Sequence, residues 1–118
     1  MPHFCHQVSF TTEAWRRLMQ NPNDHLADVR GPIEKLGGHI QNSFFMLGRY
    51  DVLAISEFPD SVSVSAISAA FASGGSVATI QTAPLLTPTE AVDALRKASA
   101  CGYHSISAPL AMARASTS

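Results

Sequence analysis

Residues 39–58, "HIQNSFFMLGRYDVLAISEF", contain two β-prone runs that are separated by only three residues. The runs "HIQNSFFML" (39–47) and "DVLAISEF" (51–58) are rich in aromatic, β-branched and other apolar residues, which favour strands. A short connection that begins with a glycine, Gly48, is typical of an antiparallel hairpin in which the glycine takes a positive φ. Whatever fold the chain adopts must therefore hold these two strands side by side and antiparallel.

A helical pattern precedes the hairpin. Thr11-Thr12 followed by Glu13 is typical of a helix start. Apolar residues then recur at helical spacing on both sides of the break "NPND", and Gly37-Gly38 ends the pattern. These apolar residues are Trp15, Leu18 and Met19, then Leu26, Val29, Ile33 and Leu36. We expect Gly31-Pro32 to kink or restart the second segment, because proline lacks an amide and crowds the preceding turn.

A second helical pattern follows the hairpin and is flanked by strand signals. Asp60 or Ser61 can cap a helix that carries Val64, Ile67 and Phe71 at helical spacing and stops at Gly74-Gly75. The runs "FCHQVSF" (4–10) and "SVATIQTA" (76–83) predict the remaining strands, the latter ending at Pro84. Finally, Thr87 and Glu90 form a capping box with Pro88 at the first helical position, which predicts a C-terminal helix.

The predicted order is β-α-β-β-α-β plus a C-terminal helix, which is the ferredoxin-like α+β arrangement. In this arrangement one four-stranded antiparallel sheet carries two helices on a single face. We expect one domain over residues 1–100 and a loosely ordered tail over 101–118, since the tail is small and polar and has no clear period.

Side-chain alternation divides the strands into two faces. We assign the bulkier set to the helices: Phe4, Val8, Phe10, Ile40, Phe44, Met46, Leu53, Ile55, Ala78 and Ile80. The other face then carries Cys5, Gln7, Ser9, Gln41, Ser43, Phe45, Val52, Ala54, Phe58, Val77, Thr79 and Gln81. Its mixture of small apolar, aromatic and uncharged polar groups indicates a seam between two copies, or a ligand cavity within that seam. His6 falls on the helix-facing side, where we interpret it as a hydrogen-bonded core histidine.

Composition excludes several functions. Charged residues make up only 14% of the 118 residues, the net charge is -1, and no basic cluster offers a surface for nucleic acid. Residues 61–89 carry no charge, but glycines and prolines interrupt them too often for a membrane-spanning helix, so no membrane partner is expected. Cys5 and Cys101 fit no metal or redox spacing, and the N-terminus does not read as a signal peptide. We therefore expect reduced thiols and a cytoplasmic location.

The chain offers few signals of chemistry. It has no Gly-x-Ser-x-Gly elbow, and its histidines lack the paired spacing of metal ligands, so neither a metal nor a cofactor is expected. Glu57 is a candidate general base if burial raises its pKa.

The hairpin combines turn residues with candidate ligand-binding residues. Gly48 and Asp51 are explained as structural turn residues. Arg49 has the planar guanidinium that suits carboxylates, and Tyr50 offers a phenol donor. We add the polar residues of the second sheet face as further ligand-binding candidates: Gln7, Ser43, Thr79 and Gln81.

The stretch "GGHIQNSFFMLGRYDVLAISEFPD" resembles the GYD-domain family of small bacterial proteins. The matching residues are Gly37, Gly38, Leu47, Gly48, Arg49, Tyr50, Asp51, Glu57, Pro59 and Asp60. The likeness extends over roughly residues 3 to 90. It implies a dimer-forming, ferredoxin-like α+β fold of dimeric α+β barrel type and implies no particular reaction. The chain departs from the family pattern at Gly31-Pro32, where a continuous helix is usual, and at Ala78 and Ile80, where charged residues are expected.

A wider likeness is to the effector domains of leucine-responsive-type regulators, in which dimer contacts around a similar hairpin form a small-ligand site. We expect a dimeric module that binds a small, partly apolar molecule or serves structurally. An acidic group on that molecule would suit Arg49. Two alternatives remain: a small cofactor-independent enzyme, isomerase-like or monooxygenase-like, with a lumen between two sheets, and a purely structural or scaffold protein.

Overall fold

The structure is a computed structural model that describes residues 1–22 and 25–104. The chain divides by its contacts into two compact units, Met1–Leu85 and Leu86–Ser118. The predicted domain boundary at residue 100 stays a prediction, and residues 105–118 of the predicted tail lie outside the described part of the chain.

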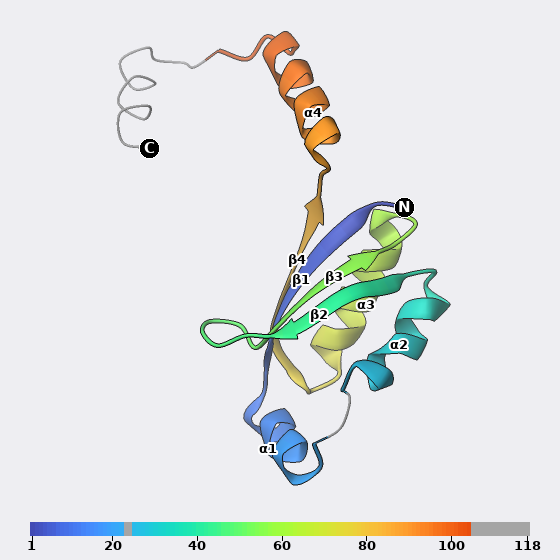
Figure 1. Cartoon of the computed structure of the whole chain (residues 1–118), viewed down its shortest axis with the longest axis vertical. Helices are drawn as coiled ribbons and strands as arrows, with labels where there is room; N and C mark the ends of the chain where they lie inside the picture. Colours follow the sequence, from blue (N-terminus) through green and yellow to red (C-terminus); the bar gives the residue numbers. More distant parts are fainter. Residues whose placement is uncertain (23–24, 105–118) are drawn as a thin grey trace. The chain divides into compact units, whose positions relative to one another are not determined.

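The first unit contains one antiparallel sheet with the strand order β2-β3-β1-β4. Its elements are β1 (His3–Phe10), α1 (Thr12–Gln20), α2 (His25–Lys35), β2 (His39–Phe45), β3 (Val52–Glu57), α3 (Ser61–Ser73) and β4 (Val77–Leu85) (Figure 1). This confirms the predicted α+β, ferredoxin-like fold. The first helical region is divided into α1 and α2, and none of the described helices is long and apolar enough to cross a membrane.

The second unit begins with α4 (Pro88–Ala100), and this helix starts as predicted. Thr87 accepts a hydrogen bond from the Glu90 amide at 3.1 Å, and the Glu90 carboxylate accepts one from the Thr87 amide at 2.9 Å. No residue of α4 is buried.

The core lies between the sheet and helices α2 and α3. Its buried residues are Phe4, Ile33, Phe58, Val64 and Ile67. The Phe58 ring is 0% exposed and packs edge-on against Phe4, with ring centroids 6.3 Å apart. A Cβ atom at Gly38 would lie only 2.5 Å from this ring. Glycine is therefore required at Gly38, because any side chain there would push Phe58 out of the core.

Helix α2 runs through Gly31 and Pro32, so the helix does not restart at this pair, and the alternative prediction of a kink stays a prediction. The missing proline amide costs the helix one hydrogen bond. However, Val29, Ile33 and Leu36 pack into or against the core on both sides of the proline. Full burial of Ile33, worth about 1.5–3 kcal/mol, together with partial burial of Val29 and Leu36, offsets that loss and keeps the helix continuous.

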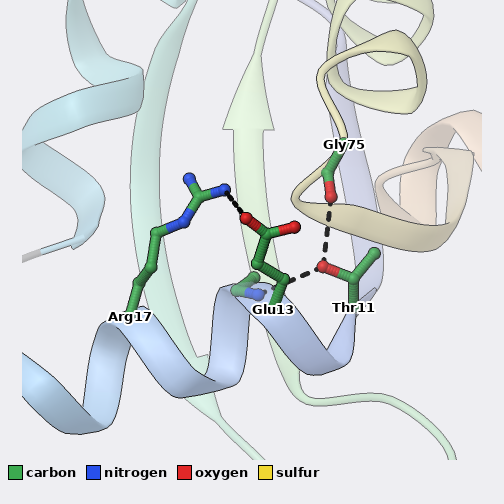
Figure 2. A network of polar contacts seen from close by, with 5 residues as sticks. Thr11, Glu13, Arg17 and Gly75 are labelled. Atoms are coloured by element: carbon green, nitrogen blue, oxygen red, sulfur yellow. Dashed lines mark hydrogen bonds and ion pairs between the residues drawn. The ribbon is translucent and has the colours of Figure 1, made fainter.

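Thr11 joins the start of α1 to the turn before β4 (Figure 2). Its hydroxyl accepts a hydrogen bond from the Ala14 amide at 3.2 Å and donates one to the Gly75 carbonyl at 3.1 Å. The Thr11 amide also donates to the Ser76 carbonyl at 3.0 Å. The nearby Arg17–Glu13 ion pair is mostly exposed and contributes little. Thr11 thus both caps the helix and fixes the Gly75–Ser76 turn.

The sheet faces differ from the prediction at β3. His6 lies opposite Ala54 and Val8 lies opposite Val52, so these β3 residues share the helix-facing side with β1. Leu53 and Ile55 therefore lie on the open face, and the predicted assignment of β3 is inverted. It relied on bulk, but on the helix side the Phe58 ring supplies the bulk, and the neighbouring β3 residues Ala54 and Ser56 are small.

The assignment of β2 also fails after its first residues. The pairing of β2 with β3 shifts between Ile40 and Asn42, and a bulge of this kind reverses the alternation. Ser43 and Phe45 consequently face the helices, whereas Phe44 lies opposite Leu53 on the open face. The bulge cannot be predicted from the alternation of side chains along the strand or from its composition.

Strand β4 continues through Pro84 to Leu85, two residues beyond its predicted end. It lies at the edge of the sheet, where a strand can accommodate a residue without an amide hydrogen.

Asp51 links the hairpin to the end of β1. Its side chain accepts a hydrogen bond from the Phe10 amide at 2.8 Å, and its own amide donates to the Val8 carbonyl at 2.8 Å. The Met46 amide donates to the Asp51 carbonyl at 2.9 Å and so closes the hairpin. Gly48 has φ +141, a value that favours glycine. These contacts give both residues structural roles.

We expect Gly38→Ala to destabilise the protein by about 1–3 kcal/mol, because the added methyl overpacks the site against the Phe58 ring. Gly31→Ala is the matched control: nothing lies within 4 Å of its added Cβ. Because Gly31 lies inside α2, alanine there should stabilise by about 0.5–1 kcal/mol. Urea unfolding of the two variants and the parent measures both effects, and equal stability of the two variants would contradict the packing described for Phe58.

Candidate functional site

A cleft of about 430 Å³ lies between the helix-facing side of the sheet and helices α2 and α3. Small residues create it: Ala70 of α3 and Gly74 at the C-terminal cap of α3 on one side, and Ser43 and Ala54 of the sheet on the other. Phe45, which also lines the cleft, is 65% exposed, so the cleft opens to solvent. The helix layer and the sheet therefore fail to close over this half of the core.

The cleft is lined mainly by apolar side chains: Val8, Phe10, Val29, Ile33, Ile40, Phe45, Val52, Ala54, Phe58, Ile67, Ala70, Phe71, Val77 and Ile80. Its polar side chains are those of His6, Ser43 and Ser76. Among the described residues that line it, none is Asp, Glu, Lys or Arg. This composition is typical of a site for an apolar small molecule.

His6 forms the polar floor of the cleft and is only 8% exposed. Its Nε2 atom lies 2.6 Å from the Ser56 hydroxyl, and its Nδ1 atom lies 3.0 Å from the Thr82 hydroxyl. Thr82 in turn lies 3.0 Å from the Ser68 hydroxyl, which donates to the Val64 carbonyl at 3.0 Å. Four side chains from β1, β3, β4 and α3 thus form one hydrogen-bonded chain.

Counting protons fixes the direction of each hydrogen bond in this chain. Ser68 has one hydroxyl proton and donates it to the Val64 carbonyl, so Thr82 must donate to Ser68. Thr82 then has no proton left and must accept from His6, which places the imidazole proton on Nδ1. In neutral His6 the Nε2 atom is consequently an acceptor, and Ser56 donates to it.

The environment of His6 favours its neutral form. Burial lowers the pKa of the His6 imidazole below its ordinary value of 6.5. The neighbouring Phe58 ring, whose centroid is 6.3 Å from that of the imidazole, offers no counter-charge. The interpretation of His6 as a hydrogen-bonded core histidine agrees with these contacts.

The polar residues predicted to bind ligand are divided between the two sides of the sheet. Gln7, Thr79 and Gln81 lie on the open face, where Gln81 accepts a hydrogen bond from the Tyr50 hydroxyl at 2.8 Å. Ser43 lies on the other side and lines the cleft. The structure therefore brings Tyr50 and Gln81 together but separates Ser43 from them.

Another side-chain pair lies on the open face, where the hydroxyls of Ser9 and Thr79 are hydrogen-bonded to each other. Arg49 is exposed and, within residues 1–22 and 25–104, makes no hydrogen bond or ion pair. The open face thus carries polar pairs beside apolar residues such as Leu53 and Ile55, and among the described residues Arg49 at the hairpin has no partner.

Glu57 also lies on the open face, away from the cleft. Its carboxylate accepts a hydrogen bond from the Gln41 amide at 2.6 Å and lies 3.2 Å from His3 Nε2. Its side chain is 26% exposed, so it lacks the deep burial that the prediction of a general base required. Among the described residues, no three histidine, cysteine or carboxylate side chains form a group that could hold a metal ion.

Sequence reasoning did not find the cleft or the complete His6 network. Ser56 and Thr82 lie 50 and 76 positions from His6 along the chain, so only the strand register brings them together. The run of alanines and serines in α3 was the available signal, because such residues leave space opposite a sheet.

We expect the free energy of unfolding to fall as the pH drops below about 6.5, because the unfolded chain takes up a proton at His6 more readily than the folded chain. Above pH 6.5 the contribution of neutral His6 is fully present; below it, the loss approaches about 1.4 kcal/mol per pH unit until the lower folded pKa is reached. Urea unfolding from pH 8 to pH 5 should give a flatter profile for His6→Gln than for the parent, since the other histidines affect both. Parallel profiles would contradict the burial of a neutral His6.

Comparisons with known proteins identify the family of the chain. A family model described as the GYD domain matches residues 4–95, which confirms the resemblance carried by the hairpin motif. A search of the curated proteins finds no match. A transcriptional regulator from Neisseria meningitidis, solved in complex with L-methionine, has a TM-score of 0.49 and 18% identity to this chain. That match covers 74% of this chain and 51% of the regulator, so the chain spans about half of its length. Because the family model spans most of the 118 residues, the chain belongs to the GYD-domain family.

Proposed function

We propose that this chain is a small-molecule-binding module whose site is the cleft between the sheet and helices α2 and α3. The observation that carries the proposal is the cleft itself. Its volume of about 430 Å³ falls within the range of roughly 300–1,000 Å³ that is usual for ligand sites. Apolar walls with a few polar groups are also usual for such sites.

This site differs from the one predicted from sequence. Of the predicted residues only Ser43 lines the cleft, and Arg49, Tyr50, Gln7, Thr79 and Gln81 do not. The cleft does not favour an acidic ligand, because no cation lines it among the described residues.

Burial of Ser56 favours binding over the alternative of a cofactor-independent enzyme. The Ser56–His6 pair has the contact distance of a nucleophile and its base, 2.6 Å. Yet Ser56 is 0% exposed and does not line the cleft, so its hydroxyl does not meet a molecule bound there. The Ser56–His6 pair stabilises the core, and the binding of a small molecule requires no reactive group.

The binding proposal can be tested with the neutral apolar fluorophore N-phenyl-1-naphthylamine. We expect its fluorescence to rise on titration with the protein. Ala70→Phe should weaken the affinity about tenfold or more, because the added ring fills part of the cleft and removes apolar contacts with the fluorophore. A tenfold change in affinity corresponds to about 1.4 kcal/mol. Ala69→Phe is the matched control, since Ala69 is the exposed neighbour on α3 and does not line the cleft. Equal affinities of the two variants would refute the cleft as the site.

We also propose that two copies associate through the open sheet face, as the dimeric α+β barrel type implies. Support comes from the apolar residues on this face: Leu53 and Ile55 lie in β3, one of its two central strands, and Phe44 and Leu85 are 60% and 38% exposed. An apolar surface of this kind is usually covered. Arg49 at the hairpin has no partner among residues 1–22 and 25–104 and is then available to a neighbouring copy.

Light scattering should give a mass of twice 12.6 kDa for the parent at micromolar concentration. Phe44→Arg should weaken association about tenfold or more, because a charge is then buried in the seam without a partner. Val62→Arg is the control, since Val62 is an apolar residue of α3 that is 77% exposed and lies off the sheet. A monomeric parent, or equal behaviour of both variants, would reject this seam.

The two cysteines, Cys5 and Cys101, are both free thiols. Free thiols persist in a reducing compartment, which supports a cytoplasmic location as part of the same proposal.

A further inference from the structure

We propose that β2 is a second interaction surface, at which two copies of the chain pair their β2 strands antiparallel. The pairing is centred on Phe44, uses the backbone of Ser43 and Phe45, and joins the two sheets edge to edge. It goes beyond the proposed function, because it requires neither a ligand in the cleft nor the seam on the open face.

Strand β2 has a free outer edge. It is the first strand in the order β2-β3-β1-β4, so within the described residues only β3 lies beside it (Figure 1). All of its residues except Ile40 are exposed. An exposed edge strand offers its outward N–H and C=O groups to a strand of another chain.

The hairpin shows which backbone groups of β2 point outward. The Met46 amide donates to the Asp51 carbonyl at 2.9 Å, so the two strands are hydrogen-bonded directly after Phe45. Hydrogen-bonded and non-hydrogen-bonded pairs alternate along an antiparallel ladder. The backbone of Phe44 therefore bonds to β3, whereas the amides and carbonyls of Ser43 and Phe45 point away from β3.

These outward groups make the edge its own complement. With a two-fold axis at Phe44, Ser43 of one copy lies opposite Phe45 of the partner subunit, and symmetry repeats the pair. Each pair can exchange both of its backbone hydrogen bonds, since both residues point outward. The two Phe44 rings then lie opposite each other on the open face, in the type of pair that brings side chains closest together.

The side chains along this edge favour a second copy as the partner. Residues 40–48 carry no charge, so two copies meet here without like charges. Phe44 and Phe45 are 60% and 65% exposed on opposite faces of the sheet, and cross-strand neighbours at about 4.5–5.5 Å would cover both rings. Because Ser43 and Phe45 also line the cleft, Phe45 of the partner subunit lies at its mouth in this arrangement.

The other edge of the sheet differs, because β4 contains Pro84, which lacks an amide hydrogen. Strand β2 contains no proline or lysine, the residues that commonly protect an edge. Its bulge lies between Ile40 and Asn42, before the residues that pair. Two β2 edges therefore form a closed pair rather than an open fibre.

The pairing of two edges buries less than the roughly 1,600 Å² of a standard stable interface. We therefore expect it above the micromolar range in which the open-face seam is expected. The average mass in light scattering should double between about 10 µM and about 1 mM, because association follows mass action. This doubling is expected whether or not the open-face seam already joins two copies.

Hydrogen exchange of single amides locates the contact. We expect the Ser43 and Phe45 amides to exchange about tenfold or more slowly at the higher concentration, since only there do they donate to the partner. Association through the open face alone leaves both amides exposed to water. A rise in mass without slower exchange of these two amides would therefore overturn the edge pairing, as would exchange rates and a mass that do not change with concentration.

Two variants at Ser43 test the edge directly. Ser43→Lys brings two like charges together at the edge, and Ser43→Pro removes the outward amide while sparing the hydrogen bonds to β3. Both should abolish the increase in mass. Ser65→Lys is the matched control, because Ser65 is an exposed residue of α3 that lies off the sheet, and it should associate like the parent. Equal association of Ser43→Lys and Ser65→Lys would refute the pairing, and this comparison decides the matter should Ser43→Pro fold poorly.

Discussion

The contact between the Phe58 ring and the backbone of Gly38 sets the geometry of the first unit. It joins the end of β3 to the chain directly after α2, and the ring fills the centre of the core. Because the ring occupies this volume, the neighbouring β3 positions hold small residues such as Ala54 and Ser56. Their size makes room for the His6 network and, further along the sheet, for the cleft.

The two sides of the sheet consequently have different characters. On the helix side, apolar walls surround a histidine whose hydrogen-bonding atoms are all occupied. On the open side, polar pairs such as Tyr50–Gln81 and Gln41–Glu57 alternate with apolar residues and remain accessible. The first arrangement suits a small apolar molecule, and the second suits a flat protein surface. The proposed ligand site and the proposed seam between copies therefore lie on opposite sides of one sheet and do not overlap.

Sequence reasoning predicted what depends on nearby residues. The hairpin around Gly48 and the capping box of Thr87 and Glu90 follow from local backbone chemistry, so they were found. The faces of β2 and β3 depend on a bulge and on pairing with β1, which is distant in sequence, and bulk alone gave the wrong faces. The continuity of α2 through Pro32 depends on tertiary burial that outweighs a local preference. The cleft was missed for a related reason: an empty volume belongs to several elements together, and no single segment encodes it.

The end of β1 is held from two directions. The carboxylate of Asp51 accepts a hydrogen bond from the Phe10 amide. The next amide, that of Thr11, donates a hydrogen bond to the Ser76 carbonyl in the turn before β4. Two consecutive peptide groups are thus clamped, one by the hairpin and the other by a residue that lines the cleft. Hydrogen bonds at the end of β1 therefore link the hairpin motif that marks the family to the rim of the proposed ligand site. A shift of the hairpin that kept both hydrogen bonds would therefore move Ser76 with it.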